Sequence, residues 1–285
     1  MRSAVARLRL TTIGRPIDLR FPTNLAIVLL SVVVFLAGLT LSLIRRDPLG
    51  PALIVGLTWG GSVFLAWVLA RETDPDRWFS AFFAAAGGLA SAVVLGSPSF
   101  LFLLWFVIGL RYINRTTGEP PGVLDFAALY GIKLWLGFTA HWTIPLLTFP
   151  TVFFADLQRL PRGLRVGLPL TLPAAAVIIG VLRGWHFLVP DWGWTEIGVI
   201  LVVAASIAPV VGGYRRVKSL GDRTGEPLKP HRVQWALGWA VVAALILTFS
   251  GTSTLQDLGP LWAAFAGTSL GWLAESTRRR FTRAA

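Results

Sequence analysis

Residues 25–44 read LAIVLLSVVVFLAGLTLSLI, an unbroken apolar run without a charged side chain. Its length matches the roughly 20 residues that an α-helix needs to span the hydrocarbon core of a bilayer. A second run of the same kind extends from Ile197 to Val211. Segments of this length and polarity predict transmembrane helices, so lipid rather than water is the solvent that decides the fold.

The overall composition leads to the same prediction. Of the 285 residues, 54% are hydrophobic and only 14% are charged, whereas soluble domains carry about 25% charged residues. A water-soluble fold of this size lacks the interior volume to hide so much apolar surface. We therefore expect an all-α, polytopic integral membrane helical bundle. The chain has no cysteine, which excludes disulfides, thiol catalysis and thiolate metal sites.

Glycine and proline clusters divide the chain into further apolar spans, because these residues interrupt helices. About ten spans can be placed, although residues 123–155 could form either two short helices or one broken one. A basic N-terminal tail (1–23) and a basic C-terminal tail (276–285) flank the transmembrane domain (24–275). The expected spans cover residues 24–44, 52–70, 75–95, 98–113, 123–139, 142–155, 166–183, 195–214, 233–250 and 257–275.

The distribution of charge favours ten spans. With this number, all but four of the 26 lysines and arginines lie in the two tails or in the loops on their side of the membrane. The exceptions are Arg45, Arg46, Arg183 and Lys133. Because basic loops stay in the cytoplasm, both termini are expected to be cytoplasmic, in a multi-pass protein of the cell (inner) membrane. The net charge of +12 then predicts contact with the lipid bilayer and its anionic lipids at these loops, and no nucleic acid.

Lys133 is the residue that points most directly to a function. It lies about ten residues into the span 123–139, or ~15 Å along a helix, which is near the midplane of a core ~30 Å thick. No aspartate or glutamate lies at the centre of any span. A charge at this depth costs at least ~2.5 kcal/mol and indicates a functional site. The alternative is a lysine that snorkels along a tilted helix to the cytoplasmic interface.

Three polar residues complete this candidate substrate-binding site. Tyr130 precedes Lys133 by one turn on the same helix face. Thr139 and His141 lie at the joint between two short spans, the second of which contains two prolines. Short spans interrupted by proline are typical of transporter binding sites. We therefore predict a site that contains Lys133, Tyr130, Thr139 and His141, although a lone histidine at this depth also fits a structural role as a hydrogen-bonding residue.

A second candidate is the acidic cluster of Glu72, Asp74 and Asp76. Carboxylates at alternate positions resemble the clusters that hold Mg²⁺ against a diphosphate in membrane prenyl-transfer enzymes, since Mg²⁺ accepts hard oxygen ligands. The sequence contains no second acidic motif of this kind. It favours instead a structural role, in which Asp74 caps a helix that begins at Pro75 and Asp76 lies in the first turn.

One short motif occurs twice. Residues 115–120 read RTTGEP and residues 223–227 read RTGEP. Both are expected on the cytoplasmic side, whereas an inverted repeat would place them on opposite faces of the membrane. The repeated motif therefore does not indicate an inverted duplication. Chance recurrence of glycine and proline after helix ends also explains it.

Three functions fit these observations. The first is a transporter or permease-like protein for a small anionic or amphipathic solute, with Lys133 as its partner. The second is an integral-membrane enzyme that acts on a lipid-linked substrate of prenyl or phospholipid type at the cytoplasmic face, through Glu72, Asp74 and Asp76. The third is an accessory membrane subunit. We predict no metal or other cofactor, except Mg²⁺ under the second function; oligomeric state and partner subunits are not indicated.

Overall fold

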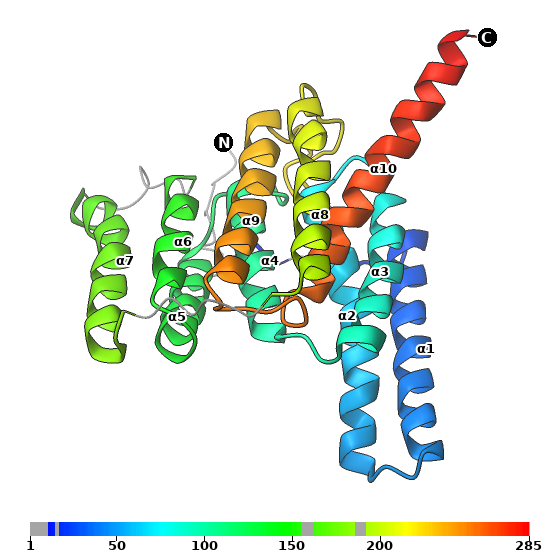
Figure 1. The fold of residues 1–285 in the computed structure, drawn as a ribbon. Coiled ribbons are helices and arrows are strands. Elements are labelled where there is room, and N and C mark those ends of the chain that lie inside the picture. Colours follow the sequence, from blue (N-terminus) through cyan, green and yellow to red (C-terminus); the bar gives the residue numbers. More distant parts are fainter. Residues whose placement is uncertain (1–10, 15–16, 155–161, 186–191, 285) are drawn as a thin grey trace, which may run out of the picture.

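The computed structural model describes residues 11–14, 17–154, 162–185 and 192–284. Within these ranges the chain forms ten α-helices and no strand (Figure 1). The all-α prediction is therefore confirmed. The helices are α1 (Pro22–Ile44), α2 (Leu49–Thr73), α3 (Ser80–Leu95), α4 (Phe100–Asn114), α5 (Val123–Thr139), α6 (Thr143–Phe153), α7 (Arg162–Arg183), α8 (Trp194–Gly213), α9 (Pro230–Phe249) and α10 (Gly259–Ala284).

The helices follow the expected spans closely. Except at the start of α3 and the end of α10, each helix begins and ends within four residues of its span. Residues 123–155 contain two helices rather than one, because α5 ends at Thr139 and α6 begins at Thr143. Four of the helices in the described part, α1, α2, α8 and α9, are long and apolar enough to cross a membrane. Ten transmembrane helices and cytoplasmic termini stay predictions.

The helices pack in three groups across the molecule (Figure 1). α1, α2, α3 and α10 lie on one side, α4, α8 and α9 in the middle, and α5, α6 and α7 on the other side. Glycines allow the first group to pack closely. A Cβ atom at Gly60 would lie 2.7 Å from the Ser31 carbonyl oxygen, and one at Gly88 would lie 2.6 Å from that of Ser62. Small residues of this kind let helix backbones approach each other within a membrane.

Two buried tryptophans connect the middle group to α6. The ring centroids of Trp105 on α4 and Trp239 on α9 lie 5.4 Å apart. Trp105 Nε1 donates to the Thr148 hydroxyl at 3.0 Å, and Trp239 Nε1 donates to the Leu147 carbonyl oxygen at 2.7 Å. Both indole N–H groups are thus satisfied within an apolar interior. These bonds fix α6, and with it the far group of helices, against the centre of the molecule.

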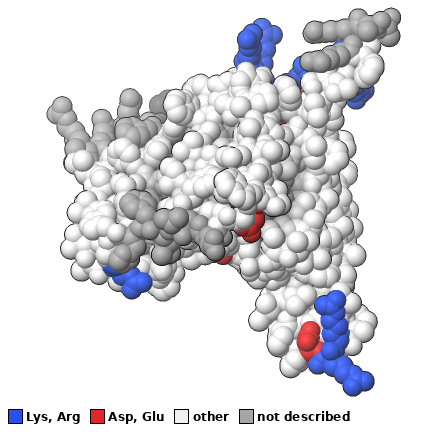
Figure 2. Space-filling model, in the orientation of Figure 1, with Lys and Arg blue, Asp and Glu red and all other residues white. Residues whose placement is uncertain are grey.

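The connections rich in basic residues meet at one end of the bundle. We call the described residues 11–14, 71–79, 111–122, 214–232 and 275–279 the basic end. Here the N-terminal segment is bonded to the start of α5, because the Thr12 backbone N–H and hydroxyl donate to Asp125 at 2.7 and 2.9 Å. Most of the face between the two ends carries no charged side chain in Figure 2. This distribution is the one that a bilayer-embedded bundle needs.

Candidate functional site

Lys133 lies in the interior of the protein, on a helix that packs against α4, α6 and α7. Its side chain is 0% exposed, and its Nζ lies 2.8 Å from the centre of the Tyr130 ring. Among the described residues, Nζ has no hydrogen-bond partner. A snorkelling lysine would bring this nitrogen to the membrane interface. The buried position of Lys133 therefore favours the functional interpretation over snorkelling.

The Tyr130 ring offsets only part of the cost of burying an ammonium group. A desolvated cation–π contact contributes about 2 kcal/mol. An isolated buried ion costs several kcal/mol even after the protein relaxes. A negatively charged ligand beside Nζ would supply the missing counter-charge. The chemistry of the pair is therefore that of an anion acceptor beside an aromatic surface.

The other two predicted residues have hydrogen-bond partners elsewhere. Thr139 is exposed, and its hydroxyl donates to the Trp135 carbonyl oxygen at 2.7 Å. Six residues of helix rotate it by ~240° from Lys133, onto another face of α5. His141 is buried, and its Nδ1 lies 2.9 Å from the Thr143 hydroxyl at the start of α6. Lys133 and Tyr130 are thus together, and Thr139 and His141 belong to the α5–α6 connection.

Gly137 allows two further helices to approach α5 near the lysine. A Cβ atom at Gly137 would lie 3.0 Å from Pro145 on α6 and 3.1 Å from Ile179 on α7. Gly137 follows Lys133 by four residues and therefore shares its helix face. The Tyr130 hydroxyl is hydrogen bonded to a side chain of α7, that of Thr171. The surroundings of Lys133 are therefore built from α5, α6 and α7.

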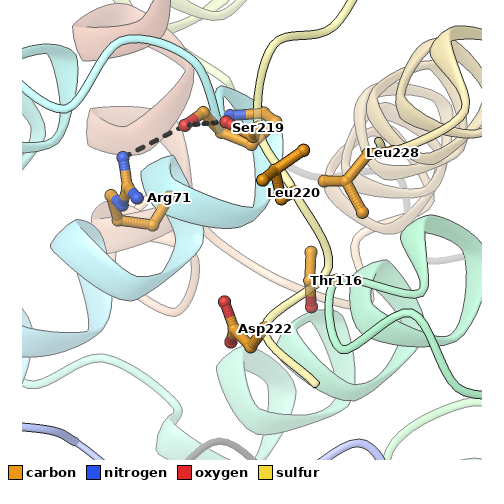
Figure 3. Close-up of a pocket in the computed structure, with 7 residues that line it drawn as sticks. Arg71, Thr116, Ser219, Leu220, Asp222 and Leu228 are labelled. Atoms are coloured by element: carbon orange, nitrogen blue, oxygen red, sulfur yellow. Dashed lines mark hydrogen bonds between the residues drawn. The ribbon is translucent and has the colours of Figure 1, made fainter. Parts of the chain in front are cut away.

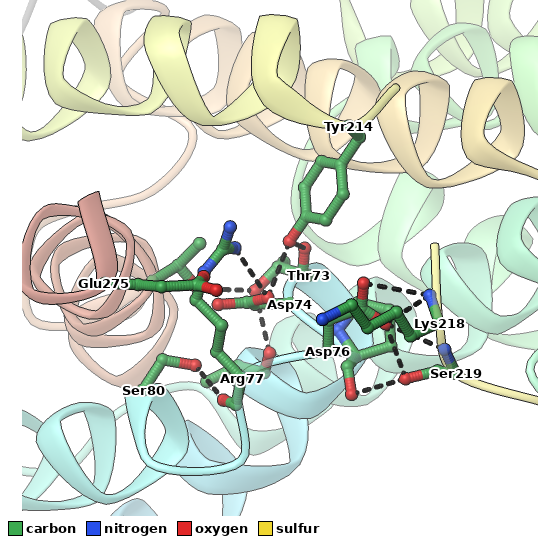
Figure 4. A network of polar contacts seen from close by, with 12 residues as sticks. Thr73, Asp74, Asp76, Arg77, Ser80, Tyr214, Lys218, Ser219 and Glu275 are labelled. Atoms are coloured by element: carbon green, nitrogen blue, oxygen red, sulfur yellow. Dashed lines mark hydrogen bonds and ion pairs between the residues drawn. The ribbon is translucent and has the colours of Figure 1, made fainter. Parts of the chain in front are cut away.

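The three carboxylates of the acidic cluster are held by different partners. Glu72 is buried at the end of α2, and Arg111 Nε donates to its Oε1 at 2.8 Å. Asp76 accepts the backbone N–H groups of Lys218 and Ser219 at 3.0 and 2.8 Å (Figure 4). The described part of the chain contains no group of three or more His, Cys, Asp or Glu side chains placed to hold a metal ion. The carboxylates thus serve separate contacts between connections.

Asp74 is the centre of a buried polar network (Figure 4). The Tyr214 hydroxyl donates to its Oδ1 at 2.7 Å, and Arg77 Nη1 pairs with the same oxygen at 3.1 Å. Arg77 also pairs with Glu275, which reaches in from α10. Burial raises the pKa of the Asp74 carboxyl above its ordinary value of 3.8, although Arg77 and Tyr214 oppose the increase. The network joins α2, the end of α8 and α10.

The prediction that Asp74 caps a helix beginning at Pro75 is wrong. Asp74 is instead the C-cap of α2, and α3 begins only at Ser80. The physical reason is that the carboxylates of Asp74 and Asp76 bond to residues far along the chain, at the end of α8 and in the α8–α9 connection.

The two echoed motifs lie against each other, which sequence reasoning missed. The backbone N–H groups of Asp222 and Arg223 donate to the carbonyl oxygens of Thr116 and Thr117, both at 3.1 Å. Arg223 also pairs with Glu119 at 3.1 Å. The repeated motif was the only sequence signal that related these two connections, and a repeat alone does not predict that they are in contact. Beside this pairing is a cavity of about 190 Å³, lined by Arg71, Pro75, Thr116, Ser219, Leu220, Asp222 and Leu228 (Figure 3).

A larger cavity of about 650 Å³ also lies at the basic end, between the α2–α3 connection, the end of α8 and α10. Sequence reasoning identified its basic segments but not their grouping, because the residues come from three separate parts of the chain. The lining residues are Asp76, Arg77, Gly213, Tyr214, Arg215, Arg216, Lys218, Glu275 and Arg279.

The fold defines an all-helical protein in which four of the described helices are long and apolar enough to cross a membrane. No protein-family model, curated protein or solved structure matches the chain. Its function is therefore argued from the two candidate sites.

Proposed function

We propose that the protein is a multi-pass membrane transporter for a small anionic or amphipathic solute, and that Lys133 binds the negative group of this solute. The observation that carries the proposal is the buried Lys133 amino group, whose Nζ has no hydrogen-bond partner in the described residues. A buried charge left uncompensated lowers stability. Its presence within a helical bundle is explained when a substrate completes the site for part of a cycle.

The proposal includes ten membrane spans, with the basic end in the cytoplasm. Support comes from Trp78 and Trp235, which are exposed near the basic end, and from Trp185 and Trp194, which are exposed near the other end. Tryptophan prefers these two interfacial depths. The helices α3, α4 and α6 are shorter than a full span, which fits a bundle whose interior holds a site below the membrane surface.

Neither of the other two functions draws comparable support. The enzyme needs Glu72, Asp74 and Asp76 to converge on a substrate-bound Mg²⁺, whereas Glu72 pairs with Arg111 on α4 and the two aspartates bond to the α8–α9 connection. An accessory subunit, which stabilises other chains, gains nothing from a buried lysine whose Nζ has no hydrogen-bond partner in the described residues. Transport of an anion explains the buried Lys133 side chain, which both alternatives leave unexplained.

Cysteine labelling tests whether Lys133 can be reached from water. Because the chain has no cysteine of its own, each introduced cysteine is the only thiol. We expect Lys133→Cys to react with the membrane-impermeant reagent methanethiosulfonate ethylsulfonate. The matched control is Leu237→Cys on α9, which is equally buried but lies outside the helices that surround Lys133, and which should not react. A second control, Trp135→Cys, replaces a side chain that is 62% exposed on the surface of the bundle and should face lipid. Equal protection at positions 133 and 237 would contradict the proposal.

Transport itself is tested in proteoliposomes with a panel of radiolabelled mono- and dicarboxylates and phosphate esters. Lys133→Met keeps the length of the side chain and removes the charge. We expect uptake of the transported anion to be lost while the unfolding temperature is unchanged or raised, since an unpaired buried ion is removed. Lys229→Met, which removes an exposed lysine at the start of α9, should transport normally. Uptake unaffected by Lys133→Met would overturn the role of the lysine.

A further inference from the structure

The 650 Å³ cavity at the basic end has the size and the charge of a ligand site. Pockets for small molecules commonly enclose about 300–1,000 Å³. Its walls carry five cationic and two carboxylate side chains, from three separate segments of the chain. Figure 4 shows how Arg77 and Tyr214 approach each other from opposite walls, with Glu275 reaching in from α10. The cavity is distinct from the surroundings of Lys133, which belong to α5, α6 and α7.

Both carboxylates in the lining are already occupied. Asp76 accepts the backbone N–H groups of Lys218 and Ser219. Glu275 pairs with Arg77 and with Arg279. The charge of Asp76 remains, because its donors are neutral N–H groups, and five cations less two carboxylates leave the lining with a net charge of +3.

Three cations in the lining are left without a carboxylate. Within the described residues, the side chains of Arg215, Arg216 and Lys218 form no ion pair, and all three are exposed. Their mutual repulsion in a concave site focuses a positive potential into the cavity. A ligand with two or more negative charges would relieve that repulsion.

We propose that this cavity binds a phosphate-type anion, either a soluble diphosphate or the phosphate of a lipid headgroup. Arginine presents a planar fork of N–H donors that matches phosphate oxygens, and lysine adds a compact point charge. The pair of arginines and the lysine therefore combine both modes of phosphate binding. The inference goes beyond the proposed transport function, because it involves other residues and a different part of the fold.

Basic residues at this end also orient the chain in the membrane, and the two roles make different demands. A basic residue that only sets the orientation of the chain needs to lie on the cytoplasmic side of the membrane, and its exact position within a connection matters little. A binding charge must line the cavity. Lys218 and Lys229 provide a matched pair: both are exposed lysines at the two ends of the same connection, and only Lys218 lines the cavity.

Binding is tested with the full chain in nanodiscs of phosphatidylcholine. Inorganic pyrophosphate is titrated by calorimetry, and nanodiscs that contain phosphatidic acid are compared by unfolding temperature. We expect saturable binding of pyrophosphate or a stabilisation by phosphatidic acid, and the probe that succeeds identifies the soluble or the lipid source. Lys218→Gln and Arg215→Gln/Arg216→Gln should weaken the response about tenfold, a change typical of a lost phosphate contact. Lys229→Gln and Lys133→Met should leave it unchanged.

Two results would overturn the inference. One is the absence of a saturable response to either probe. The other is an equal loss in Lys218→Gln and Lys229→Gln, which would show that net charge rather than the cavity is responsible. The double variant Arg45→Gln/Arg46→Gln, at the opposite end of the bundle, controls for the removal of two arginines. If Arg215→Gln/Arg216→Gln fails to fold, the lysine pair alone decides between these outcomes.

Discussion

Lys133 and Asp74 are both buried and ionisable, but their surroundings compensate them differently. Asp74 has a cation and a hydroxyl donor on the same oxygen. Among the described residues, Lys133 has only an aromatic ring beside its Nζ. Charge-assisted hydrogen bonds are among the strongest contacts in proteins, so Arg77 and Tyr214 offset part of the cost of burying the Asp74 carboxylate. Lys133 has no such hydrogen bond, and this difference makes the lysine the better candidate for a ligand contact.

The raised pKa of Asp74 gives a testable dependence of stability on pH. Because folding raises this pKa, the contribution of Asp74 to stability is complete below its ordinary value of 3.8 and is lost as pH rises through the folded-state value. We expect the unfolding temperature of the wild-type protein to fall relative to Asp74→Asn as pH rises above about 4. Asp18→Asn, at an exposed position, controls for a lost carboxylate. Parallel curves for wild type and Asp74→Asn would contradict this expectation.

The sequence located the charged residues but not their partners. Tyr130 could be assigned to Lys133 because both lie on one helix, where positions three apart share a face. Arg111 and Tyr214 could not be assigned to Glu72 and Asp74, because they come from helices that meet the acidic cluster only in the folded bundle. Thr139 and His141 were grouped with Lys133 by proximity in the sequence, and the rotation of α5 separates Thr139 from it.

Helices were easier to predict than their ends. Long apolar runs and glycine or proline breaks are local signals, so the spans emerged from the sequence with small errors. The expected start of α3 was wrong: residues 75–79 are not helical, and Asp76 in this segment bonds to the α8–α9 connection, a contact that no local signal predicts. The pairing of the echoed connections could not be predicted either, since no periodicity relates residues a hundred positions apart.

The contact between the echoed motifs depends on Gly118. Its φ of 83° is a left-handed conformation, and a Cβ atom there would lie 1.9 Å from Thr224 Oγ1 and 2.8 Å from both Thr224 carbons. Rotating the Thr224 side chain cannot relieve a clash with its Cβ. We therefore expect Gly118→Ala to destabilise the protein by backbone strain of about 1 kcal/mol and overpacking of a further ~1–3 kcal/mol, measured by chemical unfolding in detergent.

Gly225 supplies the matched control for this substitution. Its φ of 65° is also left-handed, but a Cβ atom there would meet nothing within 4 Å. Gly225→Ala should therefore show the backbone strain alone. If both substitutions destabilise the protein equally, the contact between the two connections contributes nothing beyond the conformation of each turn.

At the scale of the whole molecule, two sites with different roles follow from one distribution of charge. The basic end contains 12 of the 26 lysines and arginines, and several of them pair with carboxylates or line the larger cavity. Lys133 is the only lysine or arginine at the centre of an expected span. A solute attracted to the basic end would meet Lys133 only after entering the bundle, which is the order of events that export of an anion from the cytoplasm requires.

The proposed topology is tested by labelling single cysteines in intact cells with a membrane-impermeant maleimide. Seven helices, α2 to α8, separate Arg45 from Lys229, so the two positions must lie on opposite sides of the membrane if every helix spans it. Because basic connections stay in the cytoplasm, Arg45→Cys should be labelled in intact cells and Lys229→Cys only after permeabilisation. The reverse pattern would invert the orientation. Labelling of both from outside, or of neither, would show that an odd number of these helices fails to cross the bilayer, with the short α6 the first to reconsider.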